Sequence, residues 1–361
     1  MKILFFSDSL GSGGAQRQMV SLAVSLKKIG NDVSFLVYHN LNFFKPVLDD
    51  ANIDVKYISE DNKVKRFLKL RKYIRKGNYD IVQSFLEPVN FVNELSVLPF
   101  GKWKVIVGER SSDPKIFTNK KRYLLRWFHF FADYIVSNSY ENMRMVQKIN
   151  PFLSKKKCKV IYNYIDSNKW KPSNEYVPLK DNKLNLVVAA SHQYLKNAKG
   201  LIEAVSLLNN DEKAKLRIKW YGDRGNDDSF DKALELINKY SLNEVVEFKK
   251  AVPNINNIFQ HADIVGLFSF YEGLPNTVCE AMTVGKPVIA SSVSDIPFLL
   301  NNNQSLLFKP DDVNDIKRVL SYVLTLKENE LIRIGKKNRE RGISLFEKKN
   351  TIDQYLKLYS K

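Results

Sequence analysis

Residues 263–291 read DIVGLFSFYEGLPNTVCEAMTVGKPVIAS. An apolar run over 263–268 and another over 287–291 enclose a segment that favours a helix. Because proline is tolerated at the start of a helix and not in its interior, the helix should begin just after Pro275, with Asn276 as its N-cap. Strand, helix and strand in this order form a βαβ unit, which predicts two parallel strands.

The same alternation continues along the chain in both directions. The chain begins with an apolar run over 2–6, a glycine-rich loop over 8–14 and a helical pattern that ends at Gly30-Asn31. Further apolar runs predict strands at 33–38, 53–58, 80–84, 104–108, 133–137, 184–190, 216–221, 245–248 and 305–308. Strands that alternate with helices indicate parallel sheets covered on both faces, so we predict an α/β fold.

Length and composition favour two domains of similar size. The 361 residues exceed what one domain usually holds, and 44% of them are hydrophobic, which suffices for two cores. We predict two Rossmann-like domains, 1–168 and 169–344, that face each other across a cleft and are joined by a polar linker at 166–182. A polar, basic helix is expected from about 312 to the end, and its part at about 345–361 is a candidate to pack back on the first domain.

The net charge indicates an anionic partner. Lys and Arg total 57 against 39 Asp and Glu, a formal charge of +18, which attracts nucleic acid, nucleotides or an anionic membrane surface. No apolar run reaches the roughly 18 residues of a membrane-spanning helix, and the run at 3–6 is too short for a signal peptide. Cys158 and Cys279 are expected to be reduced thiols in a cytosolic protein, and the four histidines lack the spacing of a structural zinc site.

The loop and helix within 263–291 carry the residues best suited to chemistry. Glu272 lies in the loop before the helix, and Glu280 lies in its early turns. The free N–H groups at the helix start, beside flexible Gly273, suit a phosphate, and the two carboxylates suit the hydroxyls of a ribose and a hexose. The alternative is that both are surface acids flanking a turn.

The glycine loop near the N-terminus is a second candidate. Gly11, Gly13 and Gly14 resemble part of a dinucleotide fingerprint, but Gln16 occupies the position of the third glycine, so that fingerprint fails. The loop is either a phosphate-binding turn or a tight connection from strand to helix.

A third candidate is the loop at 108–114, which follows the predicted strand at 104–108. Glu109 and Arg110 begin this loop, and charged and hydroxyl side chains at a strand end are typical of a ligand-binding loop. Arg110 is a candidate to contact a phosphate group. The alternative is a solvated loop.

Four basic residues are mixed with Trp, Phe and Tyr over 120–131, and a run of three lysines follows at 155–157. Such a face suits the headgroup region of an anionic membrane. The alternative is a core helix whose aromatic side chains pack inward.

The block from Glu272 to Glu280 resembles the Glu-x7-Glu motif of the retaining glycosyltransferases of family 4, which have the GT-B fold. Weaker matches occur in the expected order along most of the chain: Gly13-Gly14-Ala15, Asn163-Tyr164-Ile165-Asp166, Lys196-Asn197 with Leu201-Ile202-Glu203-Ala204, and Tyr221-Gly222-Asp223. The resemblance therefore implies a two-domain GT-B enzyme whose first domain binds the acceptor and whose second binds a nucleotide sugar.

The resemblance also implies roles for individual residues. Glu280 would hold the ribose, Glu272 the transferred sugar, and Lys196 the charge of the leaving diphosphate. Other donor-binding candidates are Gly273, Leu274, Pro275, Asn276, Lys199, Gly222 and Arg224, and acceptor or phosphate candidates are Gly13, Gly14, Glu109 and Arg110. No cofactor or metal is expected, because such enzymes stabilise the leaving diphosphate without a divalent metal and this chain has no Asp-x-Asp motif near the site. The resemblance also implies that the leaving phosphate takes the acceptor's proton, so that no protein base is required.

The cationic side of this site departs from the family pattern. The family usually has an arginine about five residues before the lysine, where this chain has His192 close by and no arginine. Either His192 donates a hydrogen bond to the phosphate or another cation, Arg224, replaces the arginine. The alternative for His192 is a structural role, which is more common for a lone histidine at the end of a strand. Lys199 also precedes a glycine and is a rival to Lys196 for the phosphate.

The predicted function is transfer of a hexose or N-acetylhexosamine, with retention, from a nucleoside diphosphate sugar, with uridine diphosphate favoured by its frequency in the family. The expected acceptor is a glycan on a lipid diphosphate at the cytoplasmic face of the cell membrane, with the protein bound peripherally there and no nucleic acid as partner. Two alternatives remain: a GT-B sugar-nucleotide epimerase, and a basic nucleic-acid-binding protein.

Overall fold

The computed structural model describes residues 1–110, 112–179 and 182–360 and divides the chain into two compact units. Unit 1 comprises Met1–Tyr164 together with the chain from Lys348 onward, and unit 2 comprises Ile165–Glu347. The sequence predicts boundaries after residue 168 and near 345. Ser111, in the predicted ligand loop at 108–114, lies outside the described residues.

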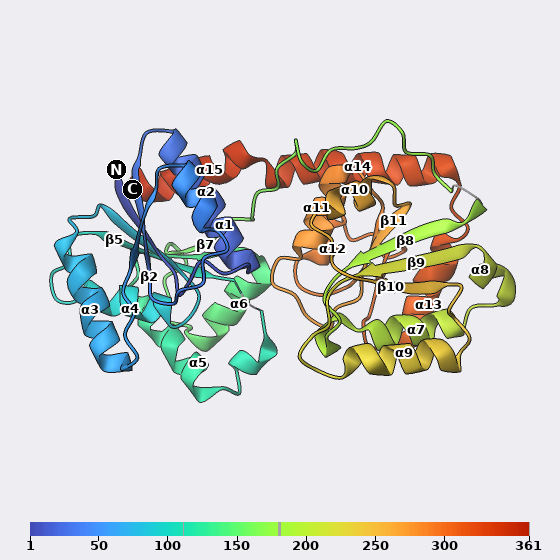
Figure 1. Ribbon diagram of the computed structural model, residues 1–361, viewed down its shortest axis with the longest axis horizontal. Helices are drawn as coiled ribbons and strands as arrows, with labels where there is room; N and C mark the ends of the chain where they lie inside the picture. The colour runs from blue at the N-terminus through green and yellow to red at the C-terminus, as the bar shows by residue number, and fades with distance from the viewer. Residues whose placement is uncertain (111, 180–181, 361) are drawn as a thin grey trace. The chain divides into compact units, whose positions relative to one another are not determined.

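Unit 1 is built on a parallel sheet with the strand order β3-β2-β1-β4-β5-β6-β7 within the described residues (Figure 1). Its strands are β1 (Lys2–Phe6), β2 (Asp32–Val37), β3 (Asp54–Tyr57), β4 (Ile81–Phe85), β5 (Lys104–Glu109), β6 (Tyr134–Ser137) and β7 (Cys158–Val160). Its helices are α1 (Gly14–Lys28), α2 (Lys45–Asp50), α3 (Lys63–Lys76), α4 (Val89–Ser96), α5 (Lys120–Leu125), α6 (Tyr140–Ile149) and α15 (Lys348–Ser360), with 3₁₀ turns η1 (Pro114–Ile116) and η2 (Arg126–Phe131). The central strands are buried on both faces, which is why they read as continuous apolar runs.

Unit 2 repeats this plan with the order β10-β9-β8-β11-β12-β13 in its described part. Its strands are β8 (Leu184–Ala189), β9 (Leu216–Tyr221), β10 (Val246–Lys249), β11 (Ile264–Leu267), β12 (Val288–Ser291) and β13 (Leu307–Phe308). Its helices are α7 (Ala198–Ser206), α8 (Asn210–Ala214), α9 (Ser229–Lys239), α10 (Ile255–Gln260), α11 (Asn276–Val284), α12 (Ile296–Leu299), α13 (Val313–Val323) and α14 (Glu328–Phe346), with the 3₁₀ turn η4 (Tyr194–Lys196). The predicted α/β class, with two Rossmann-like domains, is therefore confirmed.

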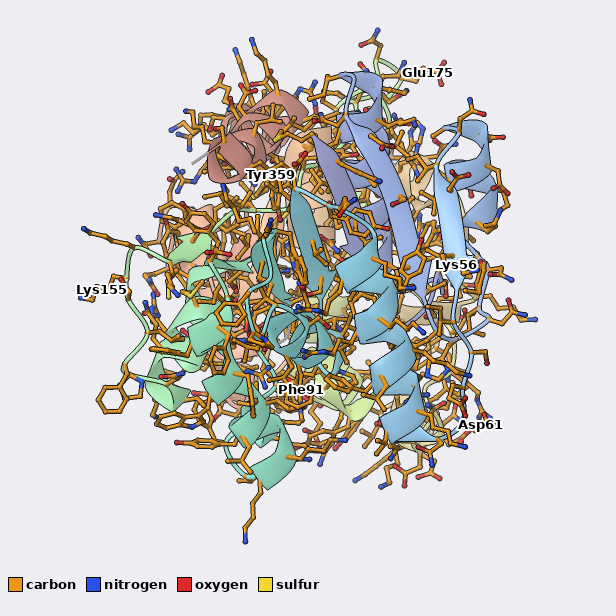
Figure 2. The ribbon with its side chains drawn as sticks, turned by 90° about the vertical axis from the view of Figure 1, so that its left-hand side faces the viewer. Lys56, Asp61, Phe91, Lys155, Glu175 and Tyr359 are labelled. Carbon is orange, nitrogen blue, oxygen red and sulfur yellow. The ribbon has the colours of Figure 1, made fainter. Side chains whose placement is uncertain are left out.

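The expected helix over 312–361 is wrong as a single element, because three helices, α13, α14 and α15, occupy that range. The Lys327 N–H donates to the Glu330 carboxylate at 2.9 Å where α14 starts anew, and Glu347 adopts extended backbone angles that end this helix. The last helix, α15, packs on unit 1, where Tyr355, Leu358 and Tyr359 join the core around β1 and β2. Figure 2 shows Tyr359 on this helix against unit 1.

The end of α15 is held by a charge from the sheet. The Lys104 ammonium donates hydrogen bonds to the carbonyls of Leu358 (3.1 Å) and Tyr359 (2.8 Å). Carbonyls in the last turn of a helix have no partner within it, and a cation there also complements the helix dipole. The C-terminal segment is thus an integral part of unit 1.

Candidate functional site

The sheet of unit 2 has its topological switch point between β8 and β11. From β8 the chain winds to one side through β9 and β10, and from β11 it winds to the other side through β12 and β13 (Figure 1). Ligands of open α/β sheets bind outside the carboxyl ends of the two strands at such a point. Lys196 follows β8 and Glu272 follows β11, so the topology places both at this crevice.

The structure brings Lys196 and Glu272 into direct contact. The Lys196 Nζ lies 2.6 Å from Glu272 Oε1, and the Ser269 hydroxyl donates to the same oxygen at 2.6 Å. Both charged side chains are only partly exposed. Sequence separation hides this pair, and Ser269 was missed because nothing in the sequence distinguishes it from other serines in loops.

Backbone conformation in the two loops explains how the pair is held. Asn197 adopts the left-handed conformation (φ 58°) and its side chain accepts a hydrogen bond from the Gly200 N–H at the start of α7. This turn ends η4 and sets the position of Lys196. The Phe270 N–H donates to the Leu195 carbonyl at 2.9 Å, which ties the two loops together.

Lys199, the rival to Lys196, lies elsewhere. It is on the first turn of α7, 67% exposed, and its ammonium pairs with Glu203 on the same helix at 3.6 Å. The geometry therefore favours Lys196 as the cation of the site.

The helix α11 begins at Asn276, as the proline predicts, but the predicted N-cap is wrong: Pro275 holds the capping position in an extended conformation. No side chain caps this end. The loop before it is fixed by Ser294, whose hydroxyl donates to the Gly273 carbonyl at 2.5 Å, and the first turn is fixed by Thr277, which donates to the Ala189 carbonyl at the end of β8. The N–H groups of this turn are therefore held at the same edge of the sheet as Lys196.

The remaining donor candidates differ in their exposure. Glu280 is 7% exposed, one turn into α11, and Leu274 and Pro275 are also buried, while Gly273 and Asn276 are half-buried. Gly222 is required by a close approach, because a Cβ there would lie 1.9 Å from the Ala190 carbonyl oxygen. The ends of β8 and β9 can therefore approach one another only with glycine at this position.

His192 does not fit the predicted role of a phosphate-binding cation. Its ring is buried among the rings of Trp220, Phe230 and Phe248, with centroid separations of 5.7, 4.9 and 4.5 Å, and neither ring nitrogen has a hydrogen-bond partner. Burial lowers the pKa of His192, so the ring is neutral near pH 7. We correct this prediction: His192 is a core residue that lies under the site.

Arg224, the other candidate for the missing arginine, follows β9 and forms a backbone bridge with His192. Its guanidinium is exposed, pairs with Asp231 and lies over the Phe230 ring, 4.6 Å from the centroid. Arg224 keeps its charge at this edge of the sheet and remains the candidate.

In unit 1, the glycine loop leads directly into α1. Gly13 is the N-cap residue and Gly14 the first helical residue, and both are exposed. The Gln16 amide donates to the Asp8 carboxylate at 3.1 Å, which closes the loop over the helix start. The N-terminus of this 15-residue helix thus presents backbone N–H groups that an anion could use.

Glu109 does not face a ligand. It is buried, its carboxylate accepts from Arg126 at 2.7 Å and contacts His129 at 3.1 Å, and His129 in turn contacts Glu94 at 2.5 Å. Although burial opposes ionisation of Glu109, Arg126 and His129 hold its pKa at about 2, and the two carboxylates raise the pKa of His129 to about 10 against the effect of burial. We therefore correct the prediction and assign Glu109 to a buried charge network.

Arg110, the next residue, does not join this buried network and contacts other parts of unit 1. Its guanidinium lies over the Phe85 ring, 4.1 Å from the centroid, and donates to Asn163 at 3.1 Å and to the Tyr355 hydroxyl at 2.7 Å. Tyr355 belongs to α15, so this arginine joins the middle of unit 1 to its C-terminal helix. The sequence carried no signal for that contact because the two residues are far apart along the chain.

In the basic and aromatic stretch over 120–131 the structure differs from the alternative of a core helix with inward-facing aromatic side chains. The stretch divides into α5 and η2, in which Arg126 and His129 are buried while Trp127 and Phe130 are exposed, the latter by 63%. Four exposed aromatic residues lie in or near this stretch, Trp127, Phe130, Phe131 and Phe152, and Leu124 is exposed as well. We call these five residues the exposed aromatic surface. Trp127 lies 6.1 Å from Phe152 between ring centroids, and Lys155, close to it in sequence, projects outward from unit 1 (Figure 2).

The described part of the chain holds neither a metal-binding cluster nor a membrane-spanning helix. Nowhere in that part of the chain do three or more His, Cys, Asp or Glu side chains gather where they could hold a metal ion. Among the same residues, every helix is too short or too polar to cross a bilayer.

Two sequence profiles match this chain. Residues 12–169 match the profile described as Glycosyltransferase Family 4, and residues 170–341 match that described as Glycosyl transferases group 1. The fold and the profiles define a two-domain glycosyltransferase with the GT-B architecture. The chain belongs to glycosyltransferase family 4.

Proteins and solved structures similar to this chain match it over nearly its whole length. The chain is 26% identical to the GalNAc-α-(1→4)-GalNAc-α-(1→3)-diNAcBac-PP-undecaprenol α-1,4-N-acetyl-D-galactosaminyltransferase of Campylobacter jejuni, over 99% of this chain and 98% of that protein. It is 25% identical to a Campylobacter jejuni N-acetylgalactosamine-N,N'-diacetylbacillosaminyl-diphospho-undecaprenol 4-α-N-acetylgalactosaminyltransferase, over 94% and 93% of the two chains. The crystal structure of Anabaena HepE with UDP has a TM-score of 0.88 at 17% identity and full coverage of both chains, which shows the shared fold.

Proposed function

We propose that this glycosyltransferase moves a hexose or N-acetylhexosamine, with retention, from a UDP-sugar to a glycan carried on a lipid diphosphate. The contact between Lys196 and Glu272 at the switch point of unit 2 carries the proposal, because it joins a cation for phosphate to a carboxylate for sugar hydroxyls. The names of both Campylobacter relatives specify an undecaprenol-linked acceptor, and HepE was crystallised with UDP, which supports this choice of substrates.

Each group at this edge then has a task in the reaction. Lys196 stabilises negative charge on the diphosphate as it leaves, and the N–H groups at the start of α11 donate hydrogen bonds to its phosphate oxygens. Glu272 accepts hydrogen bonds from hydroxyls of the transferred sugar, and Glu280 accepts them from the ribose. The departing phosphate takes the proton of the acceptor hydroxyl, so the reaction needs no protein base, and Lys196 with the N–H groups of α11 supplies the charge stabilisation that a metal ion gives in other enzymes.

Membership of family 4 favours glycosyl transfer over the two alternatives. A sugar-nucleotide epimerase needs acid and base groups beside the sugar, and the titratable pair found at the switch point is Lys196–Glu272, already engaged with each other. A nucleic-acid-binding protein explains the charge of +18 but offers no reason for a carboxylate at a phosphate site.

The exposed aromatic surface supports a peripheral position on an anionic membrane. Trp127, Phe130 and Phe152 present apolar rings to solvent, and lysines flank them in the sequence at 120–121 and 155–157. Aromatic rings beside basic residues suit the interface of a bilayer that carries anionic lipids. We therefore propose that unit 1 meets the cytoplasmic face of the cell membrane, where a lipid-linked acceptor would be found.

A panel of nucleotide sugars tests the donor assignment. UDP-hexoses and UDP-N-acetylhexosamines should raise the melting temperature of the wild-type protein and be slowly hydrolysed, and Glu280→Ala should lose both effects. Glu244→Ala removes an exposed carboxylate of unit 2 and should behave as wild type. Full donor binding by the Glu280→Ala variant would show that the ribose lies elsewhere.

A further inference from the structure

Two aromatic rings form an exposed pair beside the Lys196–Glu272 contact. Tyr194 and Phe270 stack with ring centroids 5.1 Å apart and an interplanar angle of 29°. Tyr194 is 71% exposed and Phe270 is half-buried. The two rings come from the loops after β8 and β11, the same loops that carry Lys196 and Glu272. We call Tyr194 and Phe270 the aromatic platform.

The aromatic platform is held by the backbone on both sides. The Tyr194 N–H donates to the Asp227 carboxylate at 2.9 Å, and the Phe270 N–H donates to the Leu195 carbonyl at 2.9 Å. The backbone of both loops is therefore held at the platform, and the two rings stack on each other. An ordered, exposed aromatic face costs little further conformational entropy when a flat apolar surface binds to it.

The chemistry around the platform suits a sugar ring. A pyranose has an apolar face of C–H groups and a rim of hydroxyls, so it pairs well with an aromatic ring that has hydrogen-bonding groups beside it. Under the proposed function the donor occupies Glu280, the start of α11, Lys196 and Glu272. The more exposed ring of the pair, Tyr194, lies outside that set and remains open to a second sugar.

We propose that the aromatic platform binds a pyranose ring of the glycan acceptor and so sets acceptor affinity and the choice of acceptor sugar. This inference rests on the proposed function and adds the residues that would recognise the acceptor in unit 2. Tyr194 acts through ring stacking, so phenylalanine should replace it and alanine should not.

Steady-state kinetics with a prenyl-diphosphate-linked N-acetylhexosamine disaccharide tests the proposal. Tyr194→Ala should raise the KM for this acceptor by about tenfold, the size of a lost ring contact, while the KM for the UDP-sugar and the slow hydrolysis of the donor stay unchanged. Tyr194→Phe should have the same acceptor KM as the wild-type protein. Tyr322→Ala is a matched control, because it removes a partly exposed ring on α13.

A binding measurement separates this proposal from the proposed function. Saturation-transfer NMR with the free disaccharide should show contact of its ring protons with the wild-type protein and with Tyr194→Phe, and a signal weaker by about tenfold with Tyr194→Ala at the same subsaturating concentration. This result with no turnover of any UDP-sugar would overturn the proposed function and leave a sugar-binding platform. Equal acceptor KM values for wild type and Tyr194→Ala, or an effect on the donor KM instead, would overturn the platform as an acceptor site.

Discussion

Replacing Lys196 with methionine removes the charge of the site and keeps most of the side-chain volume. In the structure the Lys196 ammonium lies 2.6 Å from the Glu272 carboxylate, and the lysine side chain is 20% exposed, so water screens its charge only in part. We expect Lys196→Met to fold normally and to lose most of its transfer activity, because the charge that builds up on the departing diphosphate is no longer countered.

The size of the loss follows from the position of the charge. Two unit charges about 4 Å apart interact by about 4 kcal/mol at the effective dielectric constant of about 20 that suits partly buried sites. Removal of a single group that stabilises a developing anion costs about 10² to 10³ in kcat in other enzymes. We therefore expect kcat to fall by about 10³, with a smaller change in the KM for the nucleotide sugar.

Lys199→Met is the matched control. Lys199 is three residues further along the chain, exposed, and paired with Glu203 at 3.6 Å, a kind of contact worth about 0.3–0.5 kcal/mol. The kcat of the Lys199→Met variant should therefore remain within about twofold of the wild-type value. The assay is release of UDP with and without acceptor, together with thermal unfolding to check the fold. If Lys199→Met lost activity and Lys196→Met kept it, the assignment of the phosphate lysine would be reversed.

Three further changes address the sugar side of the site, the buried network and the membrane surface. Glu272→Gln should raise the KM for the donor and lower kcat by about tenfold or more, because a charged hydrogen bond is lost. The melting temperature should change little, because the ion pair with Lys196 is partly exposed. A variant as active as wild type would show that Glu272 is not part of the site. The raised pKa of His129 in the folded protein stabilises it fully below the ordinary pKa of 6.5, and this stability is lost as pH rises toward about 10, whereas the low pKa of Glu109, about 2, gives stability that is lost as pH falls below about 4.5. His129→Gln should therefore lower the melting temperature and reduce the decrease of the melting temperature between pH 7 and 10. An unchanged decrease over that pH range would refute the role of this ring. The double variant Trp127→Ala/Phe130→Ala should reduce binding to vesicles with anionic lipid by about tenfold or more while hydrolysis of a soluble UDP-sugar is unaffected, and undiminished vesicle binding would move the membrane contact elsewhere.

Local sequence patterns predicted the elements around the site well. The βαβ unit of 263–291 appears as β11, α11 and β12, and α11 begins directly after Pro275. These elements were predictable because their strands are buried on both faces and their punctuation is local: a proline at the helix start and Gly285 in a left-handed conformation (φ 85°) at its end.

Predictions that needed neighbours in space failed. For the stretch over 120–131 the sequence predicts a basic, aromatic surface, with a core helix of inward-facing aromatic side chains as the alternative. The alternative fails, because the buried residues are Arg126 and His129, for whose charges Glu109 and Glu94 supply partners from other elements. His192 was considered as a cation because it stands where the family has an arginine, but three aromatic rings from other elements bury it as a neutral side chain.

The sequence alone determined the α/β class, the two-domain organisation and the motif from Glu272 to Glu280, because hydrophobic periodicity and glycine or proline punctuation act over a few residues. Only the tertiary structure decided that Lys196 rather than Lys199 meets Glu272 and that Tyr194 stacks on Phe270. Both contacts join the loop after β8 to the loop after β11, which are far apart in the chain and become neighbours only when these two parallel strands pair. Pairing of distant strands depends on burial summed over the whole sheet, and no short stretch of sequence contains that information.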